Sequence, residues 1–269
     1  FVSGAVLTDM EETLAEIEFL ALSANRVTVL AALAEAPHSR SELAELTGAS
    51  QATLGRILGD FEERHWVERA PDGYEATATG RLVAEEFDGL LSVLDTERQL
   101  RPVVDYLPTD AMAFDFRHLA DATITMPSET RPNAPLQRLL ELLRGADSVT
   151  AFSHAFNDQS LSAVTDRLDT ISFQAVLSPA AIDSLTADAE LRGRLREVVD
   201  AETATIGVYA GEIPLAVTIV DGVVHMLVRD GRGVLQAAID TDNPTVREWA
   251  KRRFEHYRVQ SEPLTAEEL

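Results

Sequence analysis

The sequence predicts two domains of different class, a helical N-terminal domain that closes with a β-hairpin and a mixed-sheet α/β domain, so that the whole chain is α+β. Three observations lead to this prediction. The chain has 269 residues, enough for two domains of about 100 to 200 residues each. Apolar residues recur three or four apart through the first part of the chain. From about residue 113, short apolar runs of strand length alternate with helical patterns.

Caps and stops mark the N-terminal helices. Pro37 ends the second helix, and Ser39 begins the next one with a capping box in which Glu42 follows three residues later. Gly48 ends that short helix, and Ser50 caps the following one. The four expected helices cover residues 10–22, 24–36, the segment between Ser39 and Gly48, and 51–65.

A hairpin and a long helix come next. Residues 66–69 and 74–77 have the composition of strands, and Pro71-Asp72-Gly73 between them is a turn sequence. From Gly80 to about Leu100, apolar residues recur at helical spacing, which predicts a helix long enough to link domains or pair subunits. We therefore expect a first domain over residues 1–80, a linker or dimerisation helix over 81–112 and a second domain over 113–269.

The second domain alternates strands and helices before it ends in hairpins and a helix. This order predicts a mixed sheet, with parallel pairs joined by helical crossovers and an antiparallel flank. The expected strands are 123–126, 149–153, 171–177, 204–209, 215–220, 223–229 and 233–239. The expected helices are 134–144, 158–168, one broken or two short helices over 179–201, and a last helix from Asn243-Pro244 to about Tyr257.

Composition excludes several classes of protein. The chain contains no cysteine, which rules out disulfide scaffolds, cysteine-ligated metals and thiol nucleophiles. No apolar run approaches the roughly 18 residues of a membrane span. No signal peptide is recognisable at the start of the sequence, which begins at Phe1. We expect a globular, cytoplasmic protein.

The charge balance is strongly acidic. Asp and Glu number 45 against 23 Lys and Arg, a net charge of −22, and Lys251 is the one lysine. This composition is typical of a halophile, because molar salt screens the self-repulsion of such a surface. A GC-rich genome would explain the preference for arginine, but not the excess of carboxylates. Taken alone, the acidity argues against a nucleic-acid partner.

The order of elements is that of a helix-turn-helix with a wing. Three helices precede a hairpin, and Gly48-Ala49-Ser50 separates the short helix after Ser39 from the helix over residues 51–65. Residues 39–87 resemble the winged-helix domains of archaeal and bacterial regulators of the ArsR, MarR and TrmB groups. The residues that match their recognition unit and wing are Leu43, Ala44, Thr47, Gly48, Ala49, Ser50, Thr53, Leu54, Arg56, Leu58, Trp66, Val67, Tyr74, Thr77 and Gly80.

A second resemblance covers the rest of the chain. Residues 134–153 and 213–258 are similar to the α/β domain found in the middle of the methanogenesis-regulating filament regulators. The chain as a whole therefore looks like haloarchaeal regulators that join a winged helix to such a domain. The resemblance implies a DNA-binding transcription regulator, and it implies no particular effector.

The helix after the turn is the expected reader of DNA bases. In winged-helix architecture its N-terminal half enters the major groove, and Gln51, Thr53 and Arg56 lie there. Arginine can bond guanine with two hydrogen bonds, glutamine can bond adenine, and the threonine methyl can contact thymine. As isolated residues these three would be ordinary surface, so the prediction depends on the winged-helix pattern around them.

Phosphate contacts are expected beside the reading helix. Ser39, Arg40 and Ser50 lie at helix starts, where backbone N–H groups and short donors can hold phosphate. The alternative for Ser39 and Ser50 is that they serve only as caps. Arg69 flanks the wing and reaches either DNA or solvent.

The expected DNA-binding domain is itself acidic. Residues 23–81 contain six arginines against nine carboxylates, a net charge of −3, whereas DNA-binding domains are usually basic. In molar salt, counterion release from phosphate contributes little to binding, so base contacts and shape would carry more of it. The alternative is a winged helix that binds protein as an adaptor, without reading DNA.

Polar residues follow the strands of the second domain. Ser153, His154 and Asn157 come directly after a buried strand, and Ser178 lies at the same edge of the next one, where ligands bind in open α/β sheets. These four residues are candidates for an effector pocket, with helix capping as the alternative. His225 is expected to be a satisfied sheet residue. The sequence shows no metal-binding spacing of histidines and no nucleophile-elbow, Walker or dinucleotide motif, so we expect no enzyme, cofactor or metal.

The sequence therefore predicts a homodimeric regulator that binds double-stranded promoter DNA. Dimerisation follows from the pairing of operator half-sites with two-fold proteins and from the apolar stripe between Gly80 and Leu100. A small-molecule effector would act by changing the spacing of the two reading helices.

Overall fold

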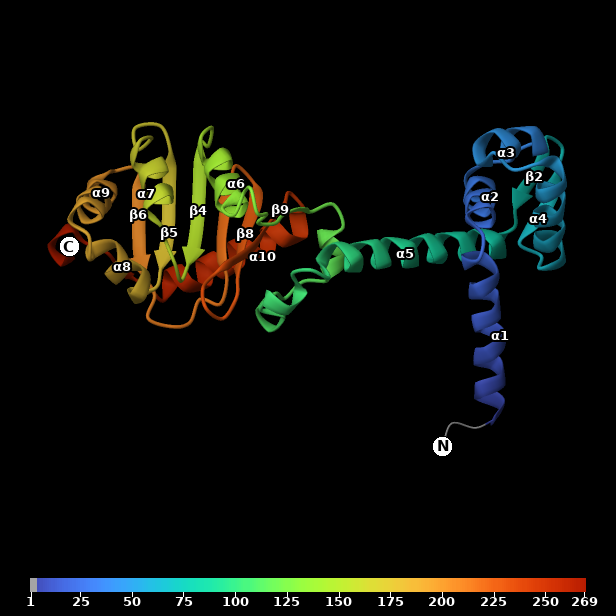
Figure 1. Ribbon diagram of the computed structural model, residues 1–269, viewed down its shortest axis with the longest axis horizontal. Coiled ribbons are helices and arrows are strands. Elements are labelled where there is room, and N and C mark those ends of the chain that lie inside the picture. The colour runs from blue at the N-terminus through green and yellow to red at the C-terminus, as the bar shows by residue number, and fades with distance from the viewer. Residues whose placement is uncertain (1–3) are drawn as a thin grey trace. The chain divides into compact units, whose positions relative to one another are not determined.

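The computed structural model describes the backbone of residues 4–269 and the side chains of residues 10–269. The chain divides into two compact units, one up to Leu94 and one from Asp95 to Leu269 (Figure 1). The expected N-terminal elements are all present, although the first helix begins earlier than predicted because no helix-breaking residue lies between Gly4 and Met10. They are α1 (Gly4–Ala21), α2 (Ala24–Glu35), α3 (Arg40–Thr47), α4 (Gln51–Glu63), β1 (Val67–Ala70), β2 (Gly73–Ala76) and α5 (Ala78–Leu100), which continues into the second unit.

The core of the N-terminal unit forms around α4. Leu54, Ile57, Leu58 and Phe61 follow helical spacing and are fully buried, as the sequence pattern predicts. They pack in one cluster with apolar residues of α1, α2, α3, the hairpin and α5, namely Leu20, Val29, Leu30, Leu33, Leu43, Val67, Tyr74, Ala76 and Ala84. Burial on one side of α4 leaves its other side to face solvent.

The end of the wing is closed by a threonine and a glycine. The Thr77 hydroxyl donates a hydrogen bond to the His65 carbonyl at 2.7 Å and accepts one from the Gly80 amide at 3.0 Å. A Cβ at Gly80 would lie 1.9 Å from the backbone oxygen of Trp66, so no larger residue fits without a shift of the backbone. These contacts explain why a Thr-x-x-Gly pattern follows the wing.

The C-terminal unit is built on an eight-stranded mixed sheet with the strand order β10-β6-β5-β4-β7-β8-β9-β3. The strands β4, β5 and β6 are parallel, and the other pairings are antiparallel, which confirms the expected mixed sheet with an antiparallel flank. The strands are β3 (Thr123–Thr125), β4 (Ser148–Ser153), β5 (Ser172–Leu177), β6 (Ala204–Val208), β7 (Ala216–Val220), β8 (Val223–Arg229), β9 (Leu235–Thr241) and β10 (Glu262–Pro263).

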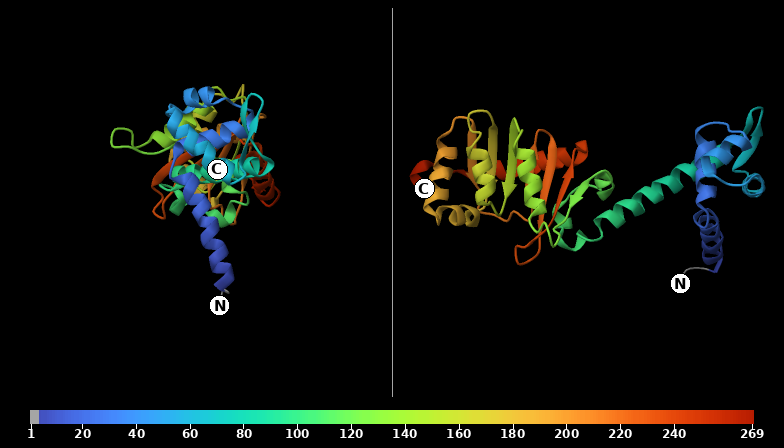
Figure 2. Two further views of the ribbon diagram at one scale, coloured as in Figure 1. Left: turned by 90° about the vertical axis from the view of Figure 1, so that its right-hand side faces the viewer. Right: turned by 45° about the horizontal axis from the view of Figure 1, so that its top comes forward.

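Helices cover both faces of this sheet (Figures 1 and 2). One face packs against α6 (Ala134–Leu143), α7 (Asp158–Thr165), α8 (Pro179–Thr186) and α9 (Ala189–Asp200). The other packs against α10 (Pro244–Val259) and the segment that holds the 3-10 helices η1 (Val104–Tyr106), η2 (Thr109–Ala111) and η3 (Phe116–Leu119). These 3-10 turns, η4 (Ala266–Glu268) and β10 were not predicted, because elements of two to four residues have no detectable periodicity.

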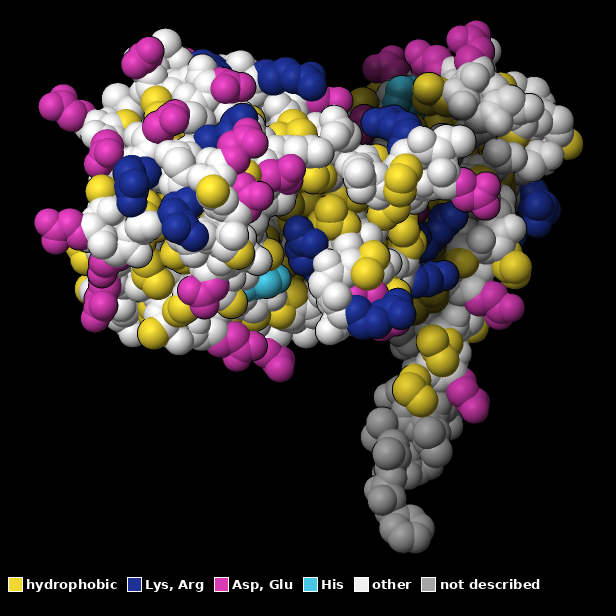
Figure 3. Space-filling model, turned by 60° about the vertical axis from the view of Figure 1, so that its left-hand side comes forward, with side chains coloured by type: hydrophobic (Ala, Val, Ile, Leu, Met, Phe, Trp, Pro, Cys, Tyr) yellow, Lys and Arg dark blue, Asp and Glu magenta, His cyan; other side chains and the backbone are white. Residues whose placement is uncertain are grey.

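The surface carries the acidic charge that the composition predicts. Figure 3 shows Asp and Glu side chains spread over the visible face, with Lys and Arg side chains between them. Within the described residues, no single helix combines the length and apolar composition of a membrane span, and the one helix pair that meets both criteria together, Met10–Ala21 with Ala24–Glu35, is bent by 94°.

Candidate nucleic-acid interface

The helices α3 and α4 are joined by a tight turn. Gly48 ends α3 with a left-handed φ of 68°, a conformation that favours glycine. Ser50 begins α4 by accepting a hydrogen bond from the Thr53 amide at 3.2 Å. Because only residues 48–50 separate the helices, the first turn of α4 follows at once, with Gln51 and Ala52 exposed.

Arg56 lies one turn further along the exposed face of α4. Its guanidinium has no ion-pair or hydrogen-bond partner among the residues that the structure describes, so it is available to a ligand. Thr53 is placed differently. It is half-buried, and its hydroxyl lies 3.0 Å from that of Ser50, so it completes the helix cap. Of the three predicted base readers, Gln51 and Arg56 therefore share a free surface, whereas Thr53 is engaged at its edge.

Two glycines lie beside Arg56, and our reading of the sequence missed them. Gly55 and Gly59 are inside α4, where each costs about 1 kcal/mol of helix stability relative to alanine. A Cβ at Gly59 would meet no described atom within 4 Å, and one at Gly55 would meet only the guanidinium of Arg40, at 3.8 Å. Packing within the protein therefore does not explain either glycine. A helix surface without side chains would let another molecule approach the backbone of α4 closely, which is a physical reason for glycine at both positions. Two glycines within a regular helical pattern are the signal that could have revealed this face.

Replacing Gly59 by alanine is expected to raise the free energy of unfolding of the N-terminal unit by about 0.5–1 kcal/mol, because the helix gains propensity and no neighbour is displaced. Urea unfolding, followed by Trp66 fluorescence in a Trp249→Phe background, measures this gain. Gly193→Ala is the matched control for DNA binding, because Gly193 also has open space around it and lies inside α9, a helix to which no DNA or subunit contact is assigned. If DNA approaches α4 closely, only Gly59→Ala also weakens DNA binding; equal DNA affinity of the two variants would count against that approach.

Ser39 and Arg40 are both engaged within the unit. The Ser39 hydroxyl accepts a hydrogen bond from the Glu42 amide at 3.3 Å, and the Glu42 carboxylate accepts one from the Ser39 amide at 2.7 Å. The backbone hydrogen bond from Ser39 lowers the pKa of Glu42, so a negative charge occupies this helix start. Arg40 donates to the Tyr74 hydroxyl at 3.2 Å and so connects α3 to the wing.

Arg69 projects from the wing and is 73% exposed. Its Nε donates to the Glu62 carboxylate at 3.1 Å, a hydrogen bond that raises the pKa of Arg69, and its guanidinium lies 5.6 Å from the centre of the Tyr74 ring. Exposed ion pairs contribute little to stability, so a phosphate could replace Glu62 as the partner at low cost.

Two other arginines of this unit belong to its packing. Arg26 and Arg64 both stack on the Phe19 ring, with guanidinium carbons 4.0 Å and 3.7 Å from the ring centre. Arg26 also pairs with Asp60 at 3.4 Å, and Arg64 pairs with Glu16 at 2.7 Å. These contacts leave fewer cations for a partner than the arginine count suggests.

The polar residues predicted at the sheet edge divide into two groups. Ser153 forms hydrogen bonds with the backbone of Ala155, and Asn157 and Ser178 are the N-caps of α7 and α8. These three therefore shape the turns that follow β4 and β5. The His154 side chain instead lines a cavity of about 290 Å³.

His225 is a buried sheet residue, but the expectation that it is satisfied was only half right. Its Nδ1 lies 2.5 Å from an Asp240 carboxylate oxygen, whereas its Nε2 has no hydrogen-bond partner within the described structure. Asp240 also accepts from Arg138 of α6 at 2.5 Å. No group of three or more potential metal ligands occurs among the described residues.

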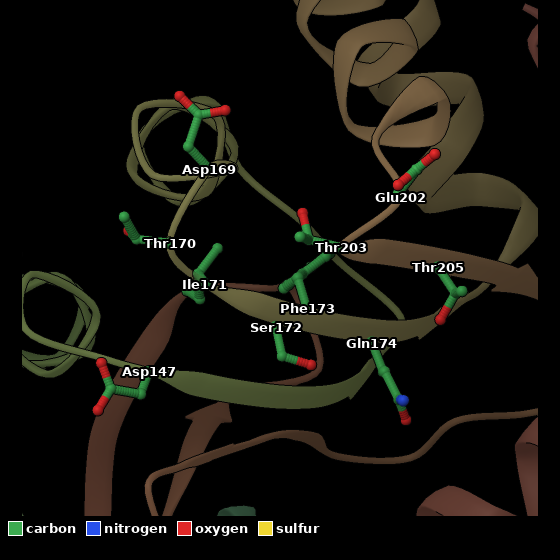
Figure 4. Close-up of a pocket in the computed structure, with 10 residues that line it drawn as sticks. All are labelled: Asp147, Asp169, Thr170, Ile171, Ser172, Phe173, Gln174, Glu202, Thr203 and Thr205. Atoms are coloured by element: carbon green, nitrogen blue, oxygen red, sulfur yellow. The ribbon is translucent and has the colours of Figure 1, made fainter.

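A shallow hollow of about 420 Å³ lies at the other edge of the sheet, where β5 and β6 begin (Figure 4). Three carboxylates line it, from Asp147, Asp169 and Glu202. Figure 4 shows them on different sides of the hollow, without convergence on a common point. The arrangement has no feature of a cation or anion site.

Comparisons with known families agree with this architecture. Residues 14–99 match the family model of the HVO_A0261 N-terminal domain, which covers the winged helix and α5. Residues 132–260 match the model of the middle domain of FilR1, a methanogenesis regulatory protein, which covers most of the sheet and its helices. The chain therefore belongs to the proteins that join an HVO_A0261 N-terminal domain to a FilR1 middle domain. No curated protein is significantly similar to this regulator.

Solved structures resemble this regulator only distantly. TrmBL2, described as an archaeal chromatin protein with a novel mode of DNA binding, covers 92% of the chain and 98% of its own, with 14% identity and a TM-score of 0.41. Nuc from Salmonella typhimurium, a phospholipase D family member, covers 54% of the chain and 99% of its own, with 11% identity and a TM-score of 0.43. The dimethyltransferase RosA from Streptomyces davawensis covers 78% of the chain and 67% of its own, with 16% identity and a TM-score of 0.26. Likenesses at this level carry no argument about function.

Proposed function

We propose that this regulator is a sequence-specific transcription factor that reads the major groove of promoter DNA with α4. The observation that carries the proposal is the exposed, unpartnered Arg56 beside Gln51, just after the tight turn between α3 and α4. In winged-helix architecture this part of the helix faces the base edges. The proposed DNA-binding domain spans residues 1–80, α5 and the following segment to residue 112 form the connection, and residues 113–269 form the sensing domain.

The acidity of the chain suits a cytoplasm with molar salt, and we propose such a halophilic setting. Salt at this concentration reduces the free energy gained by counterion release. Phosphate contacts therefore contribute little to the binding free energy, and a scarcity of basic side chains costs little affinity. Base contacts by Arg56 and Gln51 and close approach at Gly55 and Gly59 would then supply most of the specificity. No catalytic role is proposed.

We propose that the regulator acts as a homodimer that pairs through α1 and α5. Both helices expose apolar side chains at helical spacing: Met10, Leu14 and Ile17 on α1, and Leu90, Leu91 and Leu94 on α5. Exposed apolar stripes of this kind indicate a protein interface. A second copy is the partner that fits, because a two-fold dimer places two reading helices on two half-sites.

Arg56→Ala tests the DNA-reading proposal. Loss of a bidentate arginine is expected to cost about 1–3 kcal/mol and to relax the preference at one base position of the operator. Genome-wide mapping of the tagged protein in its native cells measures both effects, with Arg196→Ala as a control that removes the same charge from the exposed face of α9.

The result distinguishes a DNA reader from a protein-binding adaptor. Sharp promoter peaks that share a two-fold motif, weakened by Arg56→Ala and kept by Arg196→Ala, are expected of the regulator. A flat profile from a folded, abundant wild-type protein would overturn the DNA-reading proposal and favour the adaptor.

A further inference from the structure

The cavity beside His154 lies at the edge of the sheet where β4 and β8 end and β7 begins. Its volume of about 290 Å³ is close to the lower limit of small-molecule pockets, roughly 300 Å³. Leu215 and Leu227 supply apolar wall, and Tyr106, His154 and Arg229 supply polar groups. The cavity therefore combines apolar wall residues with a small number of polar side chains.

Arg229 brings an uncompensated positive charge to this cavity. Burial lowers the pKa of its guanidinium, but an arginine stays protonated in proteins. One nitrogen donates to the Gly233 carbonyl at 2.8 Å, whereas Nε is buried with no partner. Among the described residues no carboxylate forms an ion pair with Arg229. A buried charge without a counterion is costly, so an anion in the cavity would supply what the chain does not.

The one carboxylate in the cavity lining, Asp230, is already used by the hairpin turn. One of its oxygens accepts hydrogen bonds from the amides of Arg232 and Val234, each at 2.9 Å. The other accepts from the Gln236 amide nitrogen at 3.2 Å. These bonds hold the carboxylate in the turn, and the backbone hydrogen bond from Val234 is the main reason that the pKa of Asp230 is lowered.

His154 adds a ring nitrogen that lacks a partner. Its Nδ1 is buried and makes no hydrogen bond in the described structure. Burial lowers the pKa of His154 and the charge of Arg229 lowers it further, while a hydrogen bond between the ring and the backbone of Ile213 opposes both effects only in part. Two residues that line the same cavity therefore each hold a buried nitrogen without a hydrogen-bond partner, Nδ1 of His154 and Nε of Arg229.

We propose that this cavity binds a small organic anion, a phosphate ester or a carboxylate, through Arg229 and His154. Tyr106 offers its hydroxyl from η1, which begins four residues after the end of α5 at Leu100. A ligand that holds η1 in one position would bias the segment to which α5 is joined, provided that it binds one arrangement better than the other. That effector role rests on the proposed function, whereas the binding itself does not.

Isothermal titration of the full-length protein in molar potassium chloride tests the proposal. The probes are glycerol 3-phosphate, glycerate and glycerol, which share a carbon skeleton and differ in the anionic group. We expect at least one of the two anions to bind and glycerol not to bind. The anion that binds more tightly shows whether the cavity prefers a phosphate ester or a carboxylate. Binding of neither anion, or equal binding of glycerol, would overturn the proposal.

Two variants and a control locate the site. Arg229→Gln and His154→Gln are each expected to weaken anion binding, by about tenfold to a hundredfold for the charged donor. Arg232→Gln removes the same charge from the neighbouring turn, where the side chain is 86% exposed, and is expected to leave affinity unchanged. Thermal unfolding confirms which variants are folded. If either variant, Arg229→Gln or His154→Gln, is folded and binds the anion as tightly as the wild-type protein, the assignment to this cavity is wrong.

Operator binding is measured separately, without the anions, so that failure of the DNA-binding proposal can be distinguished from failure of the anion-binding proposal. Anion binding without DNA binding would leave the pocket in place and remove its role as an effector site. DNA binding without anion binding would overturn the pocket alone.

Discussion

Replacement of Asp240 by alanine is expected to lower the free energy of unfolding of the C-terminal unit by about 3 kcal/mol. Asp240 is 5% exposed and joins three elements, because its two oxygens contact His225 on β8 and Arg138 on α6, each at 2.5 Å. Burial by itself would raise the pKa of Asp240, but the hydrogen bonds from His225 and Arg138 outweigh it and hold the pKa below its usual range. Removal of the carboxylate leaves His225 buried without any hydrogen-bond partner for its side chain among the described residues.

Urea unfolding in molar potassium chloride, followed by Trp249 fluorescence in a Trp66→Phe background, measures this loss in the C-terminal unit. The control is Glu141→Ala, because Glu141 is the other carboxylate beside Arg138, at 3.6 Å, and its side chain is 48% exposed. Its loss is expected to cost less than about 1 kcal/mol. Equal effects of the two substitutions would contradict the stabilising role assigned to the buried pair.

The double substitution Leu90→Glu with Leu94→Glu is expected to produce a monomer and to weaken operator binding about a hundredfold or more. These side chains are 40% and 47% exposed and lie one helical turn apart on α5. Paired across a two-fold axis, four added carboxylates would meet in an interface that an apolar stripe stabilises. A monomer engages one half-site at a time and loses the gain in effective concentration.

Light scattering coupled to size exclusion gives the mass, and fluorescence anisotropy with an operator fragment gives the affinity. Met126→Glu with Val259→Glu is the matched control, because it adds the same two charges at exposed apolar positions of the C-terminal unit. A wild-type protein that is already monomeric, or a substituted protein that remains dimeric, would disprove dimerisation through α5.

The local elements of this protein could be predicted from sequence because their signals are local. Ser39 and Glu42 form the expected capping box, and Gly48 takes the left-handed conformation that ends α3. The alternating pattern after residue 113 predicted the mixed sheet because strand-length apolar runs and turn pairs are recognisable within a few residues. The resemblance to winged-helix regulators located α4 and Arg56 by the same kind of short pattern.

The candidate site could be predicted only in part, because the partner of each side chain depends on the tertiary fold. The sequence predicted both Thr53 and Gln51 as base readers on the same evidence, but the structure places the Thr53 hydroxyl 3.0 Å from that of Ser50. Arg26 and Arg64 are two of the six arginines in the charge count of residues 23–81, but packing places both against Phe19.

The sequence by itself determined where most of the helices and strands lie, which face of α4 is apolar, and the excess of negative charge, since each depends on neighbouring residues or composition. Only the tertiary structure decided which charges are compensated. It brings Arg138 and Asp240 together across 102 positions of sequence. It also places His154 and Arg229, from β-strand ends far apart in the chain, around one cavity without a carboxylate partner for Arg229 among the described residues. Long-range pairing depends on how strands are ordered in the sheet, and no local pattern specifies that order.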